Sequence, residues 1–139
     1  MIKKNLSWMN KKDLQDYAGY YFPHKPNTLN PNVGSEGIKH FTIKSIIGFI
    51  LRKQNKEFFD EVLVNRGKNP GRIDILNISD NIIIEVETEL IEETKISKRE
   101  KYDNHYIKDF IFIDLKKVPD NFQEAYDYLY SKIENLNSD

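Results

Sequence analysis

Carboxylates interrupt two short aliphatic segments near the middle of the chain. Asp74 stands within the aliphatic run of residues 72–78, and Glu85 and Glu87 stand within that of residues 82–88. A carboxylate in a central strand is costly unless a cation compensates its charge. The chain must therefore fold so that these three acids meet such a partner.

The spacing of the two segments predicts a β-hairpin. With a two-residue turn at Ser79-Asp80, Asp74 lies directly opposite Glu85, with Cβ atoms about 5 Å apart. Side chains alternate along a strand, so Glu85 and Glu87 share one face. Three carboxylates then form one patch. The opposite, core-facing side is expected to consist of Ile73, Ile75, Ile84 and Val86.

A patch of three carboxylates repels itself unless a hard cation lies among the oxygens. Mg²⁺ prefers oxygen ligands from one or two carboxylates, water and substrate phosphate. The pattern therefore predicts an acidic metal site suited to phosphodiester hydrolysis. The alternative is a solvated face on which Glu85 and Glu87 pair with Lys98 or Arg99.

Periodicity and turn formers predict the remaining elements. Helices are expected at about residues 11–20, capped by Asn10, at 35–54, at 91–104 and from Pro119 onward. Strands are expected at 57–65, 72–78, 82–88 and 109–115, and a loop at 23–34. This order predicts an α/β domain with a mixed central sheet of about four strands flanked by helices.

Charge and composition limit the classes of protein to which this sequence can belong. The 139 residues suit one domain, and the absence of cysteine excludes thiol nucleophiles and thiolate metal sites. The net charge of −1 combines a balance of +7 over residues 1–72 with −8 over residues 73–139, which suggests an anionic partner for the first half. No signal peptide or membrane segment is expected, so a cytoplasmic protein is the default.

Two short motifs resemble those of a known family. Pro70-Gly71-Arg72-Ile73-Asp74, followed by Ile84-Glu85-Val86-Glu87, resembles the signature of the PD-(D/E)XK nuclease superfamily, which includes restriction endonucleases and archaeal Holliday-junction resolvases. The resemblance covers about residues 35–115. It implies a single-domain protein in which residues 1–34 form an N-terminal helix and loop extension and residues 35–139 form a nuclease-like domain with a restriction endonuclease-like core.

The resemblance also implies a set of metal ligands. Asp74 and Glu85, joined by the backbone carbonyl of Val86, would hold Mg²⁺, for which Mn²⁺ would substitute. Many family members place a further acid on the preceding helix, which makes Glu36 an additional candidate ligand. The alternative for Glu36 is a first-turn acid that favours the helix dipole, with His40 and Lys44 on a solvated stripe behind it.

Position 87 departs from the family pattern. Most members carry a lysine there that orients or activates the attacking water, whereas this chain has Glu87, as some restriction enzymes do. Lys98 or Lys101, on the helix that follows, could supply the missing positive charge. The alternative for these lysines is an ordinary surface ion pair, which contributes little.

The sequence supports a leading functional hypothesis and an alternative. We expect a Mg²⁺-dependent DNA endonuclease, acting as a homodimer, with Asp74, Glu85 and Glu87 as catalytic residues. Its phosphate contacts would come from Arg66, Lys68, Arg72, Lys98 and Lys101. The alternative is a catalytically inactive nuclease-like module for DNA binding or assembly. RNA or DNA ends also stay open as substrates, and residues 119–136 are expected to form a closing helix or a dimer contact.

Overall fold

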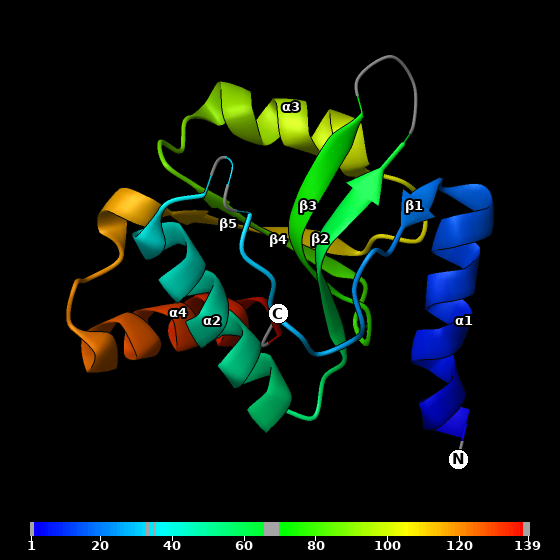
Figure 1. Ribbon diagram of the computed structural model, residues 1–139, viewed down its shortest axis with the longest axis horizontal. Helices are drawn as coiled ribbons and strands as arrows, with labels where there is room; N and C mark the ends of the chain where they lie inside the picture. The colour runs from blue at the N-terminus through cyan, green and yellow to red at the C-terminus, as the bar shows by residue number, and fades with distance from the viewer. Residues whose placement is uncertain (1, 33, 35, 66–69, 138–139) are drawn as a thin grey trace.

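The chain forms a mixed five-stranded sheet between two layers of helices (Figure 1). The computed structural model describes residues 2–32, 34, 36–65 and 70–137. Its elements are α1 (Ile2–Tyr17), β1 (Tyr20–Tyr21), α2 (Ile38–Lys53), β2 (Phe58–Val64), β3 (Gly71–Asn77), β4 (Ile82–Glu87), α3 (Glu92–Tyr102), β5 (Asp109–Asp114), the 3₁₀ turn η1 (Leu115–Lys117) and α4 (Phe122–Asn137). The predicted α/β class with a mixed sheet flanked by helices is confirmed.

The strands lie in sequence order across the sheet. Neighbours from β1 to β4 are antiparallel, whereas β5 runs parallel to β4 after the crossover through α3. The prediction of about four strands missed only β1, a two-residue edge strand in which Tyr20 pairs with Val64. The hairpin register is confirmed, because the pairing of Ile75 with Ile84 places Asp74 opposite Glu85.

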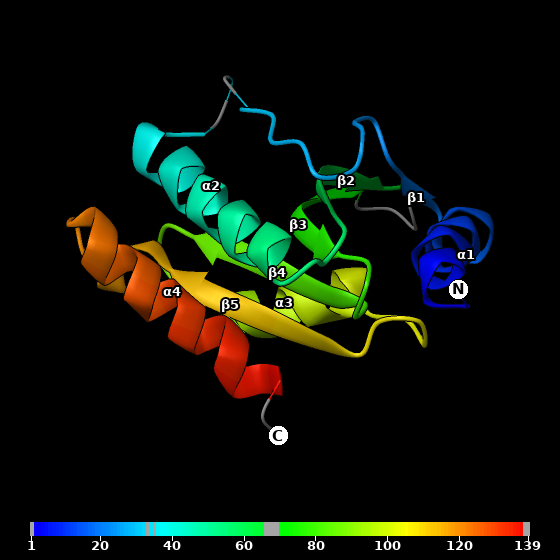
Figure 2. The ribbon, with the colours of Figure 1, turned by 90° about the horizontal axis from the view of Figure 1, so that it is seen from below.

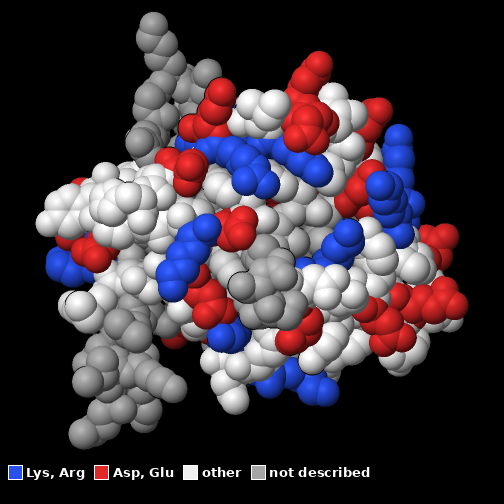
Figure 3. Space-filling view, turned by 180° about the vertical axis from the view of Figure 1, so that it is seen from behind, with Lys and Arg blue, Asp and Glu red and all other residues white. Residues whose placement is uncertain are grey.

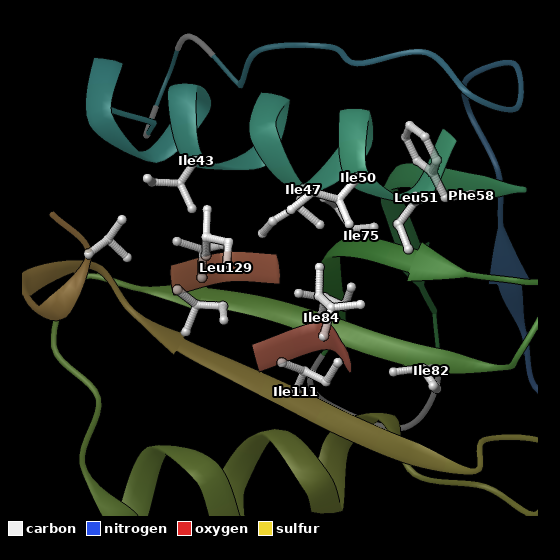
Figure 4. Close-up of a cluster of buried hydrophobic side chains, with 14 of the residues drawn as sticks. Ile43, Ile47, Ile50, Leu51, Phe58, Ile75, Ile82, Ile84, Ile111 and Leu129 are labelled. Carbon is white, nitrogen blue, oxygen red and sulfur yellow. The ribbon is translucent and has the colours of Figure 1, made fainter. Parts of the chain in front are cut away.

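The larger core lies between the sheet and the helices α2 and α4 (Figures 2 and 4). One stripe of α2, with Ile43, Ile47, Ile50 and Leu51, packs onto β3, β4 and β5, and Leu129 and Ile133 of α4 close the core beside it. These side chains recur at three- and four-residue steps, as expected of the helix predicted at residues 35–54. Both faces of β4 are buried, as the nearly continuous apolar sequence of residues 82–86 requires.

A second core lies on the other face of the sheet, against α1 and α3. Ile73 packs in this second core, whereas Ile75 packs in the first, so the prediction that both lie on one side of the hairpin is wrong. The regular alternation of side chains breaks where the buried acids occur. Opposite Asp74, Glu61 of β2 adopts a φ of 49°, which redirects the strand, and Val62 then also joins the second core.

The first and last helices begin and end elsewhere than predicted. Helix α1 starts earlier and ends at Tyr17, because the backbone turns at Gly19, whose φ is 73°. Asn10 is therefore inside α1, where its side chain donates to the carbonyl of Ile78 (3.0 Å). Helix α4 begins after Pro119, at Phe122, because the Asn121 side chain accepts the N–H of Glu124 as its cap (3.1 Å).

Two other boundaries differ from the prediction. The turn of the hairpin has four residues, 78–81, and not two, and Asn81 adopts a φ of 57° there. Helix α2 begins at Ile38, and the predicted cap, Ser35, lies outside the described residues. Among the described helices, none combines the length and apolar character that a membrane span needs.

Candidate active site

Asp74 and Glu85 lie side by side where β3 and β4 diverge. The Asp74 N–H donates to Glu85 Oε2 (2.7 Å), and the Val86 N–H donates to Asp74 Oδ2 (2.8 Å). Each carboxylate thus binds a backbone N–H of the opposite strand that the sheet ladder leaves free. The predicted juxtaposition of these two acids is confirmed, and it is held by the backbone of both strands.

Burial raises the pKa values of the two acids of β4, Glu85 and Glu87. Glu85 is only 1% exposed, and burial together with the charge of Asp74 raises its pKa well above the usual range, against the opposing effect of Lys98. Burial also raises the pKa of Glu87, which Lys98 partly counteracts. Such acids would be protonated at higher pH than exposed ones unless a further cation approaches them.

Lys98 supplies a positive charge to this acidic strand. Its Nζ lies 3.2 Å from Glu85 Oε1 and 3.5 Å from Glu87 Oε1. Burial alone would lower the pKa of Lys98, but the neighbouring charges of Glu85 and Glu87 outweigh burial and raise it. The alternative prediction, that Glu85 and Glu87 pair with Lys98 on a solvated face, is therefore correct only for the pairing. The face is not solvated, because Glu85 is buried.

Lys101 has a different position from Lys98. It lies beside Gly71 at the start of β3, where a Cβ on Gly71 would come within 2.7 Å of the Lys101 side chain and 2.6 Å of the Tyr102 ring. The Tyr102 hydroxyl, in turn, accepts from the Arg72 N–H (3.1 Å) and donates to the Arg72 carbonyl (3.0 Å). Glycine at position 71 is thus needed for α3 to approach β3 closely.

His40 connects helix α2 with the hairpin. Its Nδ1 hydrogen-bonds to Glu36 Oε2, while its Nε2 lies 3.0 Å from the Val86 carbonyl oxygen and 3.6 Å from Asp74 Oδ2. Burial alone would lower the pKa of His40, but Asp74 and Glu36 outweigh it and raise the pKa to about 9. His40 is therefore an imidazolium at neutral pH, and both ring nitrogens donate hydrogen bonds.

This imidazolium should make stability depend on pH. Because the folded-state pKa is raised from 6.5 to about 9, the stabilisation is complete below pH 6.5 and is lost as pH rises through 9. We expect the free energy of unfolding, measured by urea denaturation with a chelator present, to fall over this range, and His40→Gln to reduce the fall. His105→Gln, an exposed histidine, should leave it unchanged. Equal slopes for wild type and His40→Gln would refute the assignment.

A second group of charges lies beneath His40 and was not predicted. Lys44 is completely buried, and its Nζ lies 3.2 Å from Glu61 Oε2, 3.3 Å from Glu36 Oε2 and 3.6 Å from Asp60 Oδ2. The charges of these acids outweigh burial, which alone would lower the pKa of Lys44, and raise it. His40 and Lys44 of α2, together with Glu36, thus face inward, so the solvated alternative is wrong. Glu36 precedes α2, which begins at Ile38, so the prediction that Glu36 lies on this helix is also wrong.

Asp60 and Glu61 show the same sequence pattern as Asp74, an acid within an apolar strand. Both are acids within an aliphatic and aromatic strand, Phe58–Val64. Asp60 accepts from the Asn30 backbone N–H (2.6 Å) and side chain (3.0 Å), so it anchors the loop that precedes α2. Glu61 Oε1 has no hydrogen-bond partner within the described part of the chain, although Arg72 Nη1 is 3.5 Å away.

These groups surround an open cavity of about 410 Å³ at the N-terminal end of α2. Its charged or titratable lining residues are Glu36, Lys39, His40, Glu61, Arg72 and Asp74. Arg72 lies half exposed at the rim and so can reach a bound anion. The other two cations predicted for phosphate binding before β3, Arg66 and Lys68, lie outside the described residues.

The carboxylates of Asp74 and Glu85 have different surroundings, unlike in the predicted three-carboxylate patch. Glu85 turns toward the Asp74 N–H and Lys98, while Asp74 lines the cavity next to His40. In the described part of the chain, no three His, Asp or Glu side chains are grouped as a metal site. The oxygens nearest to His40 Nε2 belong to Asp74 and to the Val86 carbonyl, both of which were predicted as ligands.

Comparisons with protein-family models, with curated proteins and with solved structures found no match to this chain. A functional proposal for this chain therefore rests on the chemistry of the site.

Proposed function

We propose that this protein is a metal-dependent DNA endonuclease with a restriction endonuclease-like core. The observation that carries the proposal is the adjacency of Asp74 on β3 to Glu85 and Val86 on β4, with Asp74 lining a cavity that Glu36 also lines. Backbone hydrogen bonds fix the two acids, and Lys98 contacts Glu85 and Glu87 from α3.

The topology supports this proposal. The order α2, β2, β3, β4, α3, β5 is the order of elements that the resemblance to the PD-(D/E)XK superfamily implies, and both motifs lie on the neighbouring strands β3 and β4. The motif aspartate and the motif glutamate are directly adjacent in space.

The site offers oxygen donors for a divalent cation, and His40 Nε2 contacts two of them, Asp74 and the Val86 carbonyl, in the cation's place. Asp74, Glu85, the Val86 carbonyl and Glu36 would hold it, and all four offer oxygen atoms, which Mg²⁺ and Mn²⁺ prefer. Glu85 Oε1 is buried and, within the described residues, has no hydrogen-bond partner, although Lys98 lies beside it. A bound Mg²⁺ or Mn²⁺ would supply phosphate polarisation and a water of lowered pKa.

The remaining side chains have roles that follow from their positions. Lys98 balances the charges of Glu85 and Glu87 and so holds both carboxylates in place. Glu87 can accept a hydrogen bond from the attacking water. Arg72, at the cavity rim, can bind the phosphate on which that water acts. We assign the same phosphate-binding role to Arg66 and Lys68.

Cleavage assays test the proposal directly. Purified protein would be incubated with supercoiled, linear, single-stranded and branched DNA, and with RNA, in Mg²⁺, in Mn²⁺ and in a chelator. We expect at least one DNA substrate to be cut internally in the presence of metal and none to be cut with the chelator. Absence of cleavage on every substrate, or cleavage that survives the chelator, would rule the proposal out.

Replacement of Lys98 should reduce cleavage with little loss of DNA binding. We expect Lys98→Met to lower the cleavage rate by about 10²-fold, because Glu85 and Glu87 lose the cation that positions and neutralises them. Lys95→Met is the matched control, since Lys95 lies one turn away and contacts only Glu92 among the described acids (3.9 Å). Similar rates for the two variants would show that Lys98 has no role in the site.

The charge network also favours a second candidate, an inactive nuclease-like module that binds DNA or supports assembly. Lys98 already pairs with Glu85 and Glu87, and His40 already pairs with Glu36 and Asp74, so the acids have internal counterions. This candidate predicts salt-dependent DNA binding that needs no metal and survives Asp74→Ala. The same variant in a metal-dependent nuclease would abolish cleavage.

A further inference from the structure

The cavity beside Asp74 continues past Arg72 into two further depressions, of about 280 Å³ and 350 Å³. Arg72 and Asn32 line all three hollows, and Glu61 lines the cavity and the smaller depression, so the three adjoin one another. We call the two depressions the Arg72 subsite, which is also lined by Pro23, His24, Pro31, Leu63, Pro70 and Gly71. The candidate active site is therefore one end of a longer groove.

Apolar side chains from two segments form much of the wall of the Arg72 subsite. Pro23 and Pro31 belong to the segment that joins β1 to α2, while Leu63 belongs to β2. Leu63 is partly exposed and is a member of neither hydrophobic core within the described residues. Proline loses no side-chain entropy when a ligand covers it. These side chains therefore suit the flat, apolar face of a ring.

Hydrogen bonds hold residues 22–32 alongside β2 (Figures 1 and 2). The Asn27 N–H donates to the Phe58 carbonyl (2.8 Å), and the Phe58 N–H donates to Asn27 Oδ1 (2.9 Å). Further along, the Asn30 N–H donates to Asp60 Oδ2 (2.6 Å). The wall of the subsite is thus formed before a ligand arrives, which lowers the entropy cost of binding.

Glu61 offers an unused hydrogen-bond acceptor where the cavity and the subsite meet. The residue is only 6% exposed, and its Oε1 has no hydrogen-bond partner within the described part of the chain. A carboxylate oxygen repels a phosphate, but it accepts N–H groups such as those on the pairing edge of a nucleobase. In a duplex these N–H groups are engaged with the opposite strand, so only an unpaired base presents them.

We propose that the Arg72 subsite holds an unpaired nucleobase beside the phosphate that Arg72 binds, so that the protein selects DNA with unpaired nucleotides next to the cleavage position. This inference rests on the proposed nuclease function and names the form of DNA that the site takes. The small volume of each depression suits one base. A paired base would first have to leave its stack, at a cost in free energy that an unpaired base avoids.

Binding of three matched DNAs in a chelator, at one salt concentration, tests this inference without cleavage. The first DNA is a fully paired duplex, the second has a short unpaired stretch in one strand, and the third has the same stretch without its bases. By fluorescence anisotropy, we expect the second to bind about tenfold more tightly than the first. The third should lose most of this gain, because only a base fills the subsite.

Three results of this binding experiment would overturn the proposal. They are equal affinity for the paired and unpaired DNAs, an abasic stretch that binds as tightly as the intact one, and absence of binding to all three DNAs. The abasic DNA separates insertion of a base from a general preference for a flexible backbone. Because this comparison uses the wild-type chain, it does not depend on the folding of any variant.

Replacement of Leu63 tests the position of the base. Leu63→Glu should remove most of the preference for the unpaired DNA, because a base in the subsite would bury an unpaired carboxylate. Ile96→Glu is the matched control, since Ile96 is a 51% exposed side chain of α3 that lines none of the three hollows. It should keep the tenfold preference. A folded Leu63→Glu variant, verified by circular dichroism, with the full preference would refute the assignment.

Cleavage of the same DNAs in Mg²⁺ separates this inference from the nuclease proposal. We expect the unpaired DNA to be cut about tenfold faster than the duplex. If the paired and unpaired DNAs are bound and cut equally well, the subsite proposal fails and the nuclease proposal stands. If none is cut while the base-dependent difference in affinity persists, the nuclease proposal fails and the subsite stands.

Discussion

Replacing Asp74 with asparagine should lower metal-dependent DNA cleavage by about a thousandfold, which corresponds to about 4 kcal/mol of transition-state stabilisation. Asparagine has nearly the same shape as aspartate and keeps an oxygen that can accept the Val86 N–H, which donates to Asp74 Oδ2 at 2.8 Å in the wild type. The hairpin should therefore keep its geometry. Only the negative charge is lost, and with it one of the three carboxylates that line the cavity.

The rate would be measured under single-turnover conditions on the best substrate of the cleavage assays. Asp16→Asn is the matched control, because Asp16 is an exposed acid on α1 that pairs only with Lys12 among the described cations. Its rate should equal that of wild type. If Asp74→Asn cuts as fast as Asp16→Asn, Asp74 has no part in catalysis, and the assignment of the cavity as an active site fails.

The largest effect on stability is expected for Lys44→Met. Lys44 is completely buried among Glu36, Asp60 and Glu61, so its removal leaves three acids without their shared cation. Removing one partner from a buried ionic group costs about 3–5 kcal/mol, because the remaining charge stays buried without compensation. We expect a loss of this size in the free energy of unfolding, measured by urea denaturation at neutral pH.

An exposed lysine provides the control for this variant. Lys12 pairs with Asp16 on the surface of α1 (3.3 Å), and such pairs contribute at most about 1 kcal/mol. Lys12→Met should therefore have little effect on stability. A Lys44→Met variant that is also within about 1 kcal/mol of wild type would mean that the three acids accommodate the loss of the lysine, for instance by taking up protons.

The sequence predicted the part of the site that depends on local spacing. Alternation within residues 82–88 and the short connection after residue 78 were enough to place Asp74 opposite Glu85, whether the turn had two residues or four. The face of the sheet on which the Ile73 side chain lies could not be predicted from this spacing. It depends on the break in β2 at Glu61, whose φ of 49° is unusual for a residue other than glycine.

The partners of the acids were harder to predict, because they depend on packing between distant elements. The four-residue spacing of Glu36, His40 and Lys44 indicates one helix face, but the same spacing suits a solvated stripe. What turns this stripe inward is the pair of acids Asp60 and Glu61 on a strand that packs against α2. The physical reason that makes an acid within an apolar strand informative at position 74 applies equally to positions 60 and 61.

The charge imbalance along the chain does not divide the face in Figure 3 into a basic and an acidic area. The first 72 residues are basic and the rest acidic, yet the face seen in Figure 3 shows lysines and arginines interspersed with aspartates and glutamates. Strands from both halves of the sequence are neighbours in one sheet, and cations such as Lys44 are buried against acids.

Calorimetric titration of the protein with Mn²⁺ examines the proposed cation site without requiring the right DNA substrate. We expect saturable binding to the wild-type chain, weakened by about tenfold or more in Asp74→Asn and unchanged in Asp16→Asn. Absence of saturable binding to the wild-type chain, or equal binding to all three proteins, would contradict this expectation.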